Sequence, residues 1–357
     1  MSGADVLDEL LRSGATFAAF REPGGAAQAY VQHSAALDLA QEGEPCFVLA
    51  PFETEGEKAL SIRPDVLLAL GEAHPAPDGT ARATAWTDAR LRDGLDRSGY
   101  RRAVAAALAL LQPGTLRKVV LARTVRAPLG PATAGRLFEA ACAAHPRALV
   151  ALVATERFGT WLGATPERLL VAQGGHLEVD SLAGTLSIGS APRSAASWGA
   201  KEREEQAVVT EEIMHRLRHA GATGLSIHGP EVRTAGPLAH LHTRITGCLN
   251  TAAVLALAGE LHPTPAVGGI PRTEAQRLIA ALEPRKRSLY AGYWGPMDGG
   301  GARLFVNIRC MELSPTDALL HVGAGITAAS DPDGECDEVE LKARTWTDLI
   351  ARVQRGG

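Results

Sequence analysis

The chain has 357 residues, of which 46% are hydrophobic and 21% are charged, a composition typical of a globular protein with one large domain or two ordinary domains. Its formal net charge of −4 leaves no electrostatic footprint for nucleic acid or for an anionic membrane. No apolar run approaches the roughly 18 residues that span a bilayer. The first residues also lack the basic region followed by an apolar region that is typical of a signal peptide. We therefore expect a cytoplasmic protein.

The cysteines favour the same compartment. Their number is odd, and none of them stands in a C-x-x-C or histidine-clustered spacing. Such usage favours a reducing cytoplasm and argues against a zinc site. The five cysteines are Cys46, Cys142, Cys248, Cys310 and Cys336.

The first hundred residues contain short apolar runs at 46–52 and 66–71 among glycine, proline and acidic residues. Residues 71–86 are predicted to form a loop because of their composition. Residues 100–111 are rich in strong helix formers and are predicted to form a helix, which the Gln-Pro-Gly sequence at 112–114 ends.

After residue 116, long strand-like runs predominate, with a few helices between them. This pattern predicts an α+β fold with large, mainly antiparallel β-sheets. We find no repeat, low-complexity tract or clear linker, so we expect a single domain over residues 1–357. The predicted strands are residues 118–125, 148–155, 160–165, a hairpin over 168–185 that turns at Gly174 and Gly175, and the runs 289–298, 302–313 and 318–328; further helices are predicted at 201–220, 251–259 and 272–282.

Residues 330–343 read SDPDGECDEVELKA, and they combine turn residues with a helix start that is crowded with carboxylates. The ordinary explanation is that acids favour a helix N-terminus, where the macrodipole attracts negative charge. Glu338 and Lys342 also have the spacing of a surface ion pair. This explanation accounts for the segment when it is considered alone.

A second acidic segment, KEREE at 201–205, changes the balance. Glu202 and Glu205 lie three residues apart and share one face of a helix, and Glu335 and Glu338 repeat that spacing. Two such pairs can surround one hard divalent cation, and Mg²⁺ prefers a few carboxylates with retained waters and an anionic ligand. Because E-x-x-E is also common on exposed helices, the spacing leaves both explanations open.

Four further polar or glycine-rich positions stand out, although each has an ordinary structural explanation. Lys118 precedes an apolar strand and could be a strand-end lysine held in solvent, and Glu167 could be a helix cap or first-turn acid. Arg309 lies within FVNIRCM, where strand alternation could place it on either face of a sheet. The Gly-Ala-Gly sequence at 323–325 could form a tight turn or let backbone N–H groups approach an anion.

Taken together, these segments resemble the chorismate-utilising enzymes, and specifically the isochorismate synthases. The resemblance runs from about residue 116 to the C-terminus, so residues 116–357 bear the motifs and residues 1–100 form a variable N-terminal part. It implies a single chorismate-binding domain in which two large antiparallel sheets pack together with helices outside. The segments are KVVLART, GATPERLL, DSLAGT, KEREE, HLHT, LHPTPAVGGIP, IRC, VGAGI and SDPDGECDEVELKA, in family order.

The resemblance also implies a reaction and a role for each residue. Chorismate would gain a hydroxyl from water at C2 and lose its 4-hydroxyl, with Lys118 as the base and Glu167 as the acid, whose pKa must be raised. The implied site residues are Glu202, Glu205, Glu335 and Glu338 for Mg²⁺ and the ring carboxylate, Arg309, Lys342 and the backbone N–H of Gly325 for the enolpyruvyl carboxylate, and Gly184, Thr185, His240 and Ala266 for the ring pocket.

Three positions discriminate among members of the family. Anthranilate-forming relatives carry glutamine where Lys118 stands, and aminodeoxychorismate-forming relatives use a lysine where Ala183 stands. Salicylate-forming relatives usually carry threonine where Ala266 stands. The combination implies water addition that stops at isochorismate. One departure is Gln206, because the family usually has histidine after the ligand glutamate, and glutamine cannot carry a proton or a charge.

Two alternatives remain at this level. A salicylate synthase would go on to eliminate pyruvate, and a chorismate-binding protein without catalysis would keep only the pocket. The small molecule chorismate is the one partner expected, with no nucleic acid and no membrane, and the chain is expected to be a monomer. The sequence leaves open whether the product serves siderophore, menaquinone or salicylate biosynthesis.

Overall fold

The computed structural model describes residues 1–53, 56, 58–71, 86, 91–111, 115–235, 238–249 and 254–356. Most of the loop predicted at 71–86 and the predicted helix stop at 112–114 lie outside these residues. No helix among the described residues is both long enough and apolar enough to cross a membrane.

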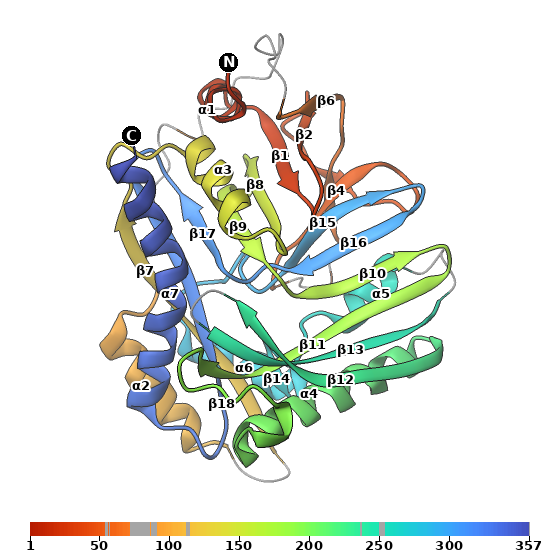
Figure 1. The fold of residues 1–357 in the computed structure, drawn as a ribbon, viewed down its shortest axis with the longest axis vertical. Coiled ribbons are helices and arrows are strands. Elements are labelled where there is room, and N and C mark those ends of the chain that lie inside the picture. Colours follow the sequence, from red (N-terminus) through yellow and green to blue (C-terminus); the bar gives the residue numbers. More distant parts are fainter. Residues whose placement is uncertain are drawn as a thin grey trace.

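The elements follow one another as a succession of strands interrupted by single helices (Figure 1). The helices are α1 (Gly3–Ser13), α2 (Arg97–Leu108), α3 (Ala134–Ala144), α4 (Ala200–His219), α5 (Val254–Leu261), α6 (Arg272–Leu282) and α7 (Pro332–Arg355), with a short 3₁₀ turn at Ala195–Ser197. The strands are β1 (Thr16–Arg21), β2 (Ala27–Gln32), β3 (Asp38–Leu39), β4 (Cys46–Ala50), β5 (Leu60–Ile62), β6 (Val66–Ala69), β7 (Lys118–Pro128), β8 (Leu149–Thr155), β9 (Gly159–Thr165), β10 (Arg168–Gln173), β11 (His176–Ser187), β12 (Thr223–Ala235), β13 (Leu238–Cys248), β14 (Gly269–Ile270), β15 (Tyr293–Asp298), β16 (Gly301–Val306), β17 (Cys310–Leu313) and β18 (Asp317–Ile326).

Within the described residues the strands form two nine-stranded sheets. The first has the order β14-β7-β18-β17-β9-β8-β1-β2-β6, and the second has the order β12-β13-β11-β10-β16-β15-β4-β5-β3. Neighbouring strands are antiparallel, as in the pairs β7–β18 and β11–β13. The prediction of an α+β fold with two large antiparallel sheets and helices outside is therefore confirmed.

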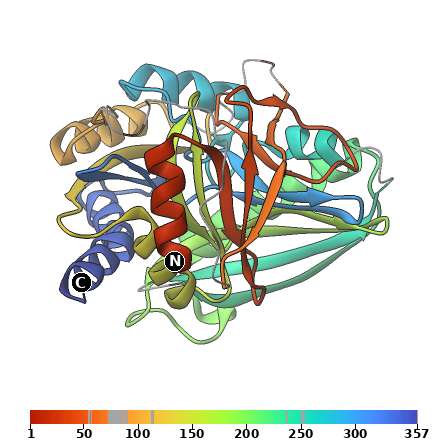
Figure 2. The ribbon, with the colours of Figure 1, turned by 90° about the horizontal axis from the view of Figure 1, so that it is seen from above.

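The N-terminal segment is built into both sheets. Strands β1, β2 and β6 extend the first sheet, whereas β3, β4 and β5 extend the second. In Figure 2 the red and orange strands of this segment lie against the later strands. Phe17 and Phe47 from this segment are fully buried in the same hydrophobic cluster as Trp294 and Ile326. Sequence reasoning found no motif here, yet these residues fill part of the common core.

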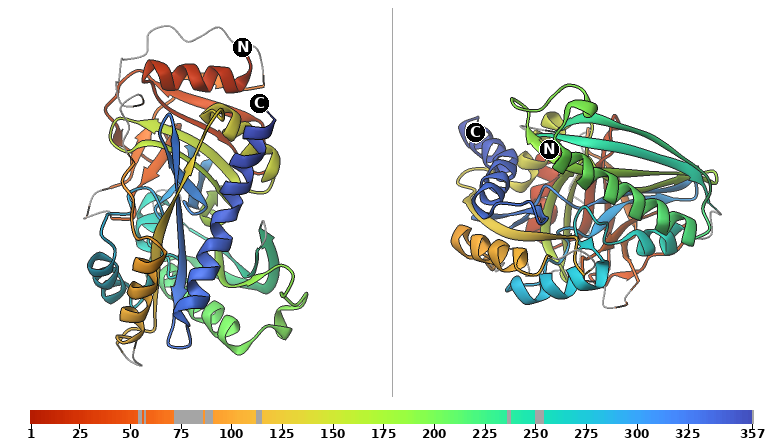
Figure 3. Two further views of the ribbon diagram at one scale, coloured as in Figure 1. Left: turned by 90° about the vertical axis from the view of Figure 1, so that its left-hand side faces the viewer. Right: turned by 90° about the horizontal axis from the view of Figure 1, so that it is seen from below.

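The helices cover the outside of the sheets. Helices α2 and α7 lie side by side along one flank (Figures 1 and 3), and α4 packs on β11 and β13 of the second sheet. Helix α7 begins at Pro332, where the side chain of Asp331 accepts a hydrogen bond from the N–H of Gly334 and caps the helix. Pro332, Asp333 and Gly334, which are turn residues by composition, therefore belong to its first turn.

Local sequence signals predicted most elements after residue 100 well. The helix at 272–282 has the predicted bounds, and the hairpin of β10 and β11 turns at Gly174 and Gly175 as predicted. Helix α2 begins at Arg97, three residues before the predicted start, because Asp96 caps it by accepting a hydrogen bond from the N–H of Gly99 at 2.6 Å. The first three residues of the helix predicted at 251–259 lie outside the described residues, and the remainder is α5.

The prediction of one strand over 302–313 is wrong. Strand β16 ends at Val306 in the second sheet, and β17 begins at Cys310 in the first. Arg309 lies in the connection with φ of 52°, a left-handed conformation that is uncommon for an arginine. Strands β12 and β13 and helix α3 were not predicted; in the two strands, polar residues interrupt the apolar ones.

Candidate active site

One pocket collects nearly all the residues that the sequence singles out. Its walls come from both sheets and from the N-terminal turns of α4 and α7. Among its lining residues are Lys118, Glu167, Ala183, Thr185, Glu202, Glu205, His240, Ala266, Arg309, Gly325, Glu335, Glu338 and Lys342.

Gly184 is the predicted site residue that does not line this pocket. It occupies a bulge of β11 with φ of 65°, between two residues that do line it. A Cβ atom at Gly184 would lie 3.1 Å from Cβ of Glu202. Glycine is therefore required here for a close approach between β11 and α4, behind the pocket wall.

Two crossovers between the sheets position Glu167 and Arg309. Glu167 lies in the short link from β9 to β10, and Arg309 lies in the link from β16 to β17. Each link is hydrogen-bonded to a strand that adjoins the other link: the N–H of Val306 in β16 donates to the carbonyl of Glu167 at 3.0 Å, and the N–H of Ala164 in β9 donates to the carbonyl of Arg309 at 3.0 Å. The acid and the arginine are thus held at the place where the chain changes sheets.

Glu167 is set up to remain protonated near neutral pH. Glu167 is buried, with only 3% of its surface exposed. Burial, and then the negative charge of Asp180, raise the pKa of Glu167 to about 8, although Lys118, Arg309 and Lys342 act in the opposite direction. A carboxylic acid with such a pKa can donate a proton at neutral pH.

Lys118 is buried, not held in solvent as a strand-end lysine would be. It is 3% exposed, and its Nζ lies 2.8 Å from Oε1 of Glu205. Burial would raise the pKa of Glu205, but the charge and hydrogen bond of Lys118 outweigh burial, and the pKa is lowered. A Cβ atom at Gly325 would lie 2.9 Å from both Cε of Lys118 and Oε1 of Glu205. Only glycine at this position leaves the ion pair undisturbed.

Arg309, His240 and Thr185 form a hydrogen-bonded chain along one wall. Nη2 of Arg309 lies 2.9 Å from Nε2 of His240, and Nδ1 of His240 lies 3.1 Å from Oγ1 of Thr185. Because arginine can only donate, Nε2 must accept and Nδ1 carries the hydrogen. Burial and the charge of Arg309 hold the pKa of His240 well below its usual value, so the imidazole is neutral. Burial lowers the pKa of Arg309 to about 10.

The crowded carboxylates of α7 divide into two groups. Asp333 and Asp337 are exposed and pair with Arg101 and Arg97, as on an ordinary solvated helix face, and the partly exposed Glu340 pairs with the buried Arg123. Glu335 and Glu338 turn instead toward the pocket, where Glu202 and Glu205 of α4 also lie.

Lysines contact three of the four pocket carboxylates. Besides the pair of Lys118 and Glu205, Nζ of Lys342 lies 2.7 Å from Glu338, and Nζ of Lys201 lies 3.4 Å from Glu335. Within the described residues, no three histidine, cysteine or acidic side chains are gathered closely enough to hold a metal ion. The donor set nevertheless suits Mg²⁺, because the two helix starts bring four hard carboxylate groups to one pocket.

Gln206 faces away from the pocket. Its amide oxygen accepts from the N–H of Ala183 at 2.8 Å, and its amide nitrogen donates to the carbonyl of Ser181 at 3.0 Å and to Oγ1 of Thr243 at 2.9 Å. An amide can both donate and accept, so Gln206 joins α4 to β11 and β13. The hydrogen bonds of its side chain go to Ala183, Ser181 and Thr243 and not to the pocket carboxylates.

Several lining residues were missed from the sequence. Lys201 stands directly before the acidic pair of α4, and its position in KEREE was the one available signal. Tyr290, His321 and Trp346 also line the pocket. Tyr290 and His321 stack at 5.2 Å between ring centroids, although 31 residues separate them in sequence, so no local pattern could pair them.

Residues 39–351 match the family model described as chorismate binding enzyme. The chain belongs to this family. It is 32% identical to the salicylate biosynthesis isochorismate synthase of Pseudomonas aeruginosa over 89% of this chain and 69% of that protein. It is also 34% identical to isochorismate synthase EntC of Escherichia coli over 71% of this chain and 68% of that protein. The structure of MenF, the menaquinone-specific isochorismate synthase of Escherichia coli, has the same fold, with a TM-score of 0.76, 22% identity and coverage of 96% of this chain and 91% of that one. The predicted family is confirmed.

Proposed function

We propose that this chain is an isochorismate synthase, an isomerase that converts chorismate into isochorismate. Water is added at C2 of the ring while the 4-hydroxyl departs, so the reaction needs a base and an acid in one pocket. The observation that carries the proposal is that a buried lysine and a buried glutamic acid, whose pKa is raised to about 8, line the same pocket. Relatives that are at least 30% identical carry the name isochorismate synthase, which supports the same activity.

Lys118 and Glu167 divide the proton transfers between them. Lys118, once it has released its own proton, takes a proton as the neutral amine from the water that attacks C2. Glu167, protonated at neutral pH, gives its proton to the oxygen that leaves C4. Burial of both groups excludes bulk water from the reacting atoms and strengthens the electrostatic effects of their neighbours.

The cations of the pocket suit a substrate with two carboxylates. Arg309 presents a planar fork that can bind a carboxylate through two hydrogen bonds. Lys342 lies one helical turn from Glu338 and donates to the carbonyl of Gly323 at 2.8 Å, which holds its ammonium beside β18. These two groups, with the backbone N–H of Gly325, are assigned to the enolpyruvyl carboxylate.

Glu202, Glu205, Glu335 and Glu338 are assigned to Mg²⁺. A bound Mg²⁺ would neutralise and fix the ring carboxylate of the substrate. Glu205 and Glu338 are expected to be the direct ligands. Glu202→Gln and Glu335→Gln should therefore lower the affinity for Mg²⁺ less than Glu205→Gln and Glu338→Gln do.

Two alanines favour isochorismate as the final product. Ala183 and Ala266 line the pocket, where a lysine or a threonine would introduce a nucleophile or a further hydroxyl. Neither position therefore offers a group for amine chemistry or for the later elimination of pyruvate.

The experiment is incubation of the purified protein with chorismate, with and without Mg²⁺, followed by chromatographic separation of the products. The proposal expects isochorismate that forms only with the metal and little salicylate or pyruvate. Stoichiometric pyruvate release would make the protein a salicylate synthase. Binding of chorismate without turnover at any metal concentration would make it a chorismate-binding protein.

A further inference from the structure

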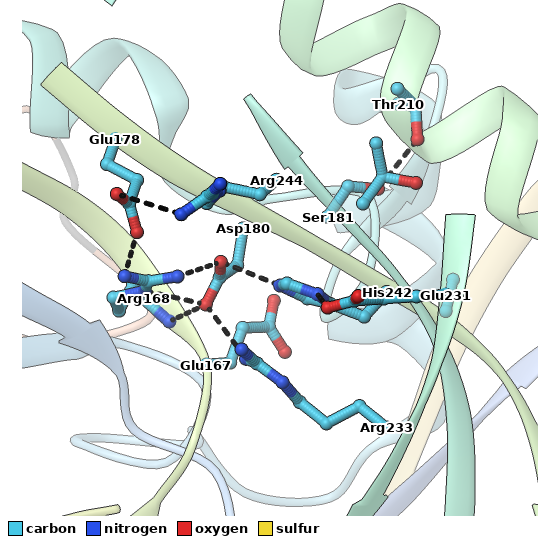
Figure 4. Close-up of polar contacts among 12 residues, drawn as sticks. Glu167, Arg168, Glu178, Asp180, Ser181, Thr210, Glu231, Arg233, His242 and Arg244 are labelled. Atoms are coloured by element: carbon cyan, nitrogen blue, oxygen red, sulfur yellow. Dashed lines mark hydrogen bonds and ion pairs between the residues drawn. The ribbon is translucent and has the colours of Figure 1, made fainter. Parts of the chain in front are cut away.

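A buried group of charged residues lies behind Glu167. Its centre is Asp180 of β11, which is 1% exposed. The carboxylate of Asp180 accepts from Nε of Arg168 at 3.0 Å and from Nη2 at 2.8 Å, and Nε2 of His242 donates to it at 2.8 Å. Nη1 of Arg233 lies 3.5 Å away (Figure 4). We call these four residues the Asp180 cluster.

The cluster stands outside the pocket. None of its four residues is among those that line the pocket, so a substrate there would not touch them. Burial alone would raise the pKa of Asp180, but the hydrogen bonds from His242 and Arg168 outweigh burial and hold the pKa well below its usual value. Asp180 therefore carries a negative charge throughout the range in which an enzyme of this kind is assayed.

Glu167 lines the pocket and directly precedes Arg168 of the Asp180 cluster in the chain. Figure 4 shows its carboxyl group next to Asp180, whose charge acts on it. The negative charge of Asp180 acts on Glu167 more strongly than any other charged neighbour, second only to burial. The charges that act on Glu167 are those of Asp180 on β11, Lys118 on β7, Arg309 in the crossover and Lys342 on α7. His240 on β13 lines the same pocket, and Arg168 on β10, Arg233 on β12 and His242 on β13 contact Asp180.

This arrangement resolves a conflict within the pocket. Cations that attract the carboxylates of a substrate also favour ionisation of any nearby acid. Lys118, Arg309 and Lys342 all act on Glu167 in that direction. A fixed negative charge on the far side of Glu167 opposes them without repelling the substrate directly.

We propose that Asp180 is a positioning residue that keeps Glu167 protonated and so able to act as the acid. Arg168 and His242 fix the Asp180 carboxylate in place, and Arg233 moderates its charge. The inference rests on the proposed function of Glu167 as the proton donor.

The test compares the pH dependence of turnover in two variants that change the charge in opposite senses. Asp180→Asn keeps the shape but removes the negative charge, so the alkaline limb should move down by about one pH unit or more. Arg233→Gln removes a cation whose side chain is 32% exposed, so the limb should move up by a smaller amount. Loss of stability cannot produce shifts of opposite sign.

Arg244→Gln is the matched control. Arg244 is an arginine on β13 that lies 3.9 Å from Glu178 and is 47% exposed, and it makes no ion pair with Asp180. Its removal should leave the alkaline limb unchanged. If Asp180→Asn fails to fold, Arg233→Gln decides the question by itself: an upward shift supports the inference, and an unchanged limb overturns it.

An infrared titration of the protonated carboxyl band of Glu167, assigned by its loss in Glu167→Gln, gives a second readout without turnover. The band should disappear at lower pH in Asp180→Asn and at higher pH in Arg233→Gln. A band that titrates identically in all variants would overturn the inference. Failure of the proposed function has a different signature, because Glu167→Gln would then keep its turnover whatever the infrared titration shows.

Discussion

Replacement of Lys118 by alanine should separate catalysis from stability at the centre of the pocket. Loss of a positioned base typically slows turnover by about 10²–10⁴-fold, which corresponds to about 2.7–5.4 kcal/mol of barrier at about 1.36 kcal/mol per factor of ten. The same change also removes the partner of Glu205, at 2.8 Å in a pair whose side chains are 3% and 14% exposed.

The stability cost follows from that burial. Breaking a buried ion pair by removing one partner typically costs about 3–5 kcal/mol, because the other charge remains without compensation. Glu205 keeps the charges of Lys342 and Lys201 near it, so we expect about 3 kcal/mol. Lys201→Ala is the control for stability: its ammonium is 39% exposed and lies 3.4 Å from Glu335, and its loss should cost less than about 1 kcal/mol.

The assay combines urea denaturation with turnover and chorismate affinity, all measured at a temperature at which both variants are folded. Lys118→Ala should bind chorismate, because the carboxylate contacts are assigned elsewhere, and it should lose turnover. Unchanged turnover would refute the base assignment. Lost affinity with normal residual chemistry would make Lys118 a substrate-binding residue instead.

Three further predictions follow from the same geometry. Glu205→Gln and Glu338→Gln should each abolish turnover at ordinary Mg²⁺ concentrations. Asp337→Asn, on the outer face of α7 and 75% exposed, should not. If turnover depends on the Mg²⁺ concentration in the same way in all three variants, the metal assignment is contradicted. Gly325→Ala places a methyl group 2.9 Å from Oε1 of Glu205 and should lower turnover by about 10²-fold with little change in the melting temperature. A large drop in the melting temperature together with the loss of turnover would refute a local effect. The raised pKa of Glu167 means that the folded protein keeps a proton that the unfolded chain loses. This group's contribution to the free energy of unfolding should therefore fall as pH rises from 4.5 to about 8. Urea denaturation at several pH values should show this fall in the parent protein and not in Glu167→Gln, and the same pH dependence in both proteins would contradict the prediction.

Local patterns were sufficient where an element depends on neighbouring residues. The helix at 272–282 and the hairpin at Gly174 and Gly175 were predictable because helix formers and turn glycines act over a few positions. The change of sheet between Val306 and Cys310 was not predictable, since apolar residues continue through FVNIRCMEL on both sides of it. Only long-range pairing shows that two strands are present there.

The residues of the candidate site were predicted mainly through the family resemblance. The contacts that these residues make with one another and with their neighbours were not predicted. Residues separated by many positions in sequence pair there, as Glu205 does with Lys118 and Asp180 with His242. The E-x-x-E spacing had already separated Glu335 and Glu338, which line the pocket, from the other carboxylates of α7. The arginine partners of Asp333, Asp337 and Glu340 lie far away in sequence and could not be predicted.

The most direct measurement of the central claim is the conversion of chorismate in water labelled with a heavy oxygen isotope, with Mg²⁺ present and the product examined by mass spectrometry. Water addition at C2 with departure of the 4-hydroxyl predicts isochorismate that carries one heavy oxygen on the ring. The same protein with Glu167→Gln should give almost none of this product. Isochorismate without the heavy oxygen would show that the hydroxyl moves within the substrate, and it would contradict the roles assigned here to Lys118 and Glu167.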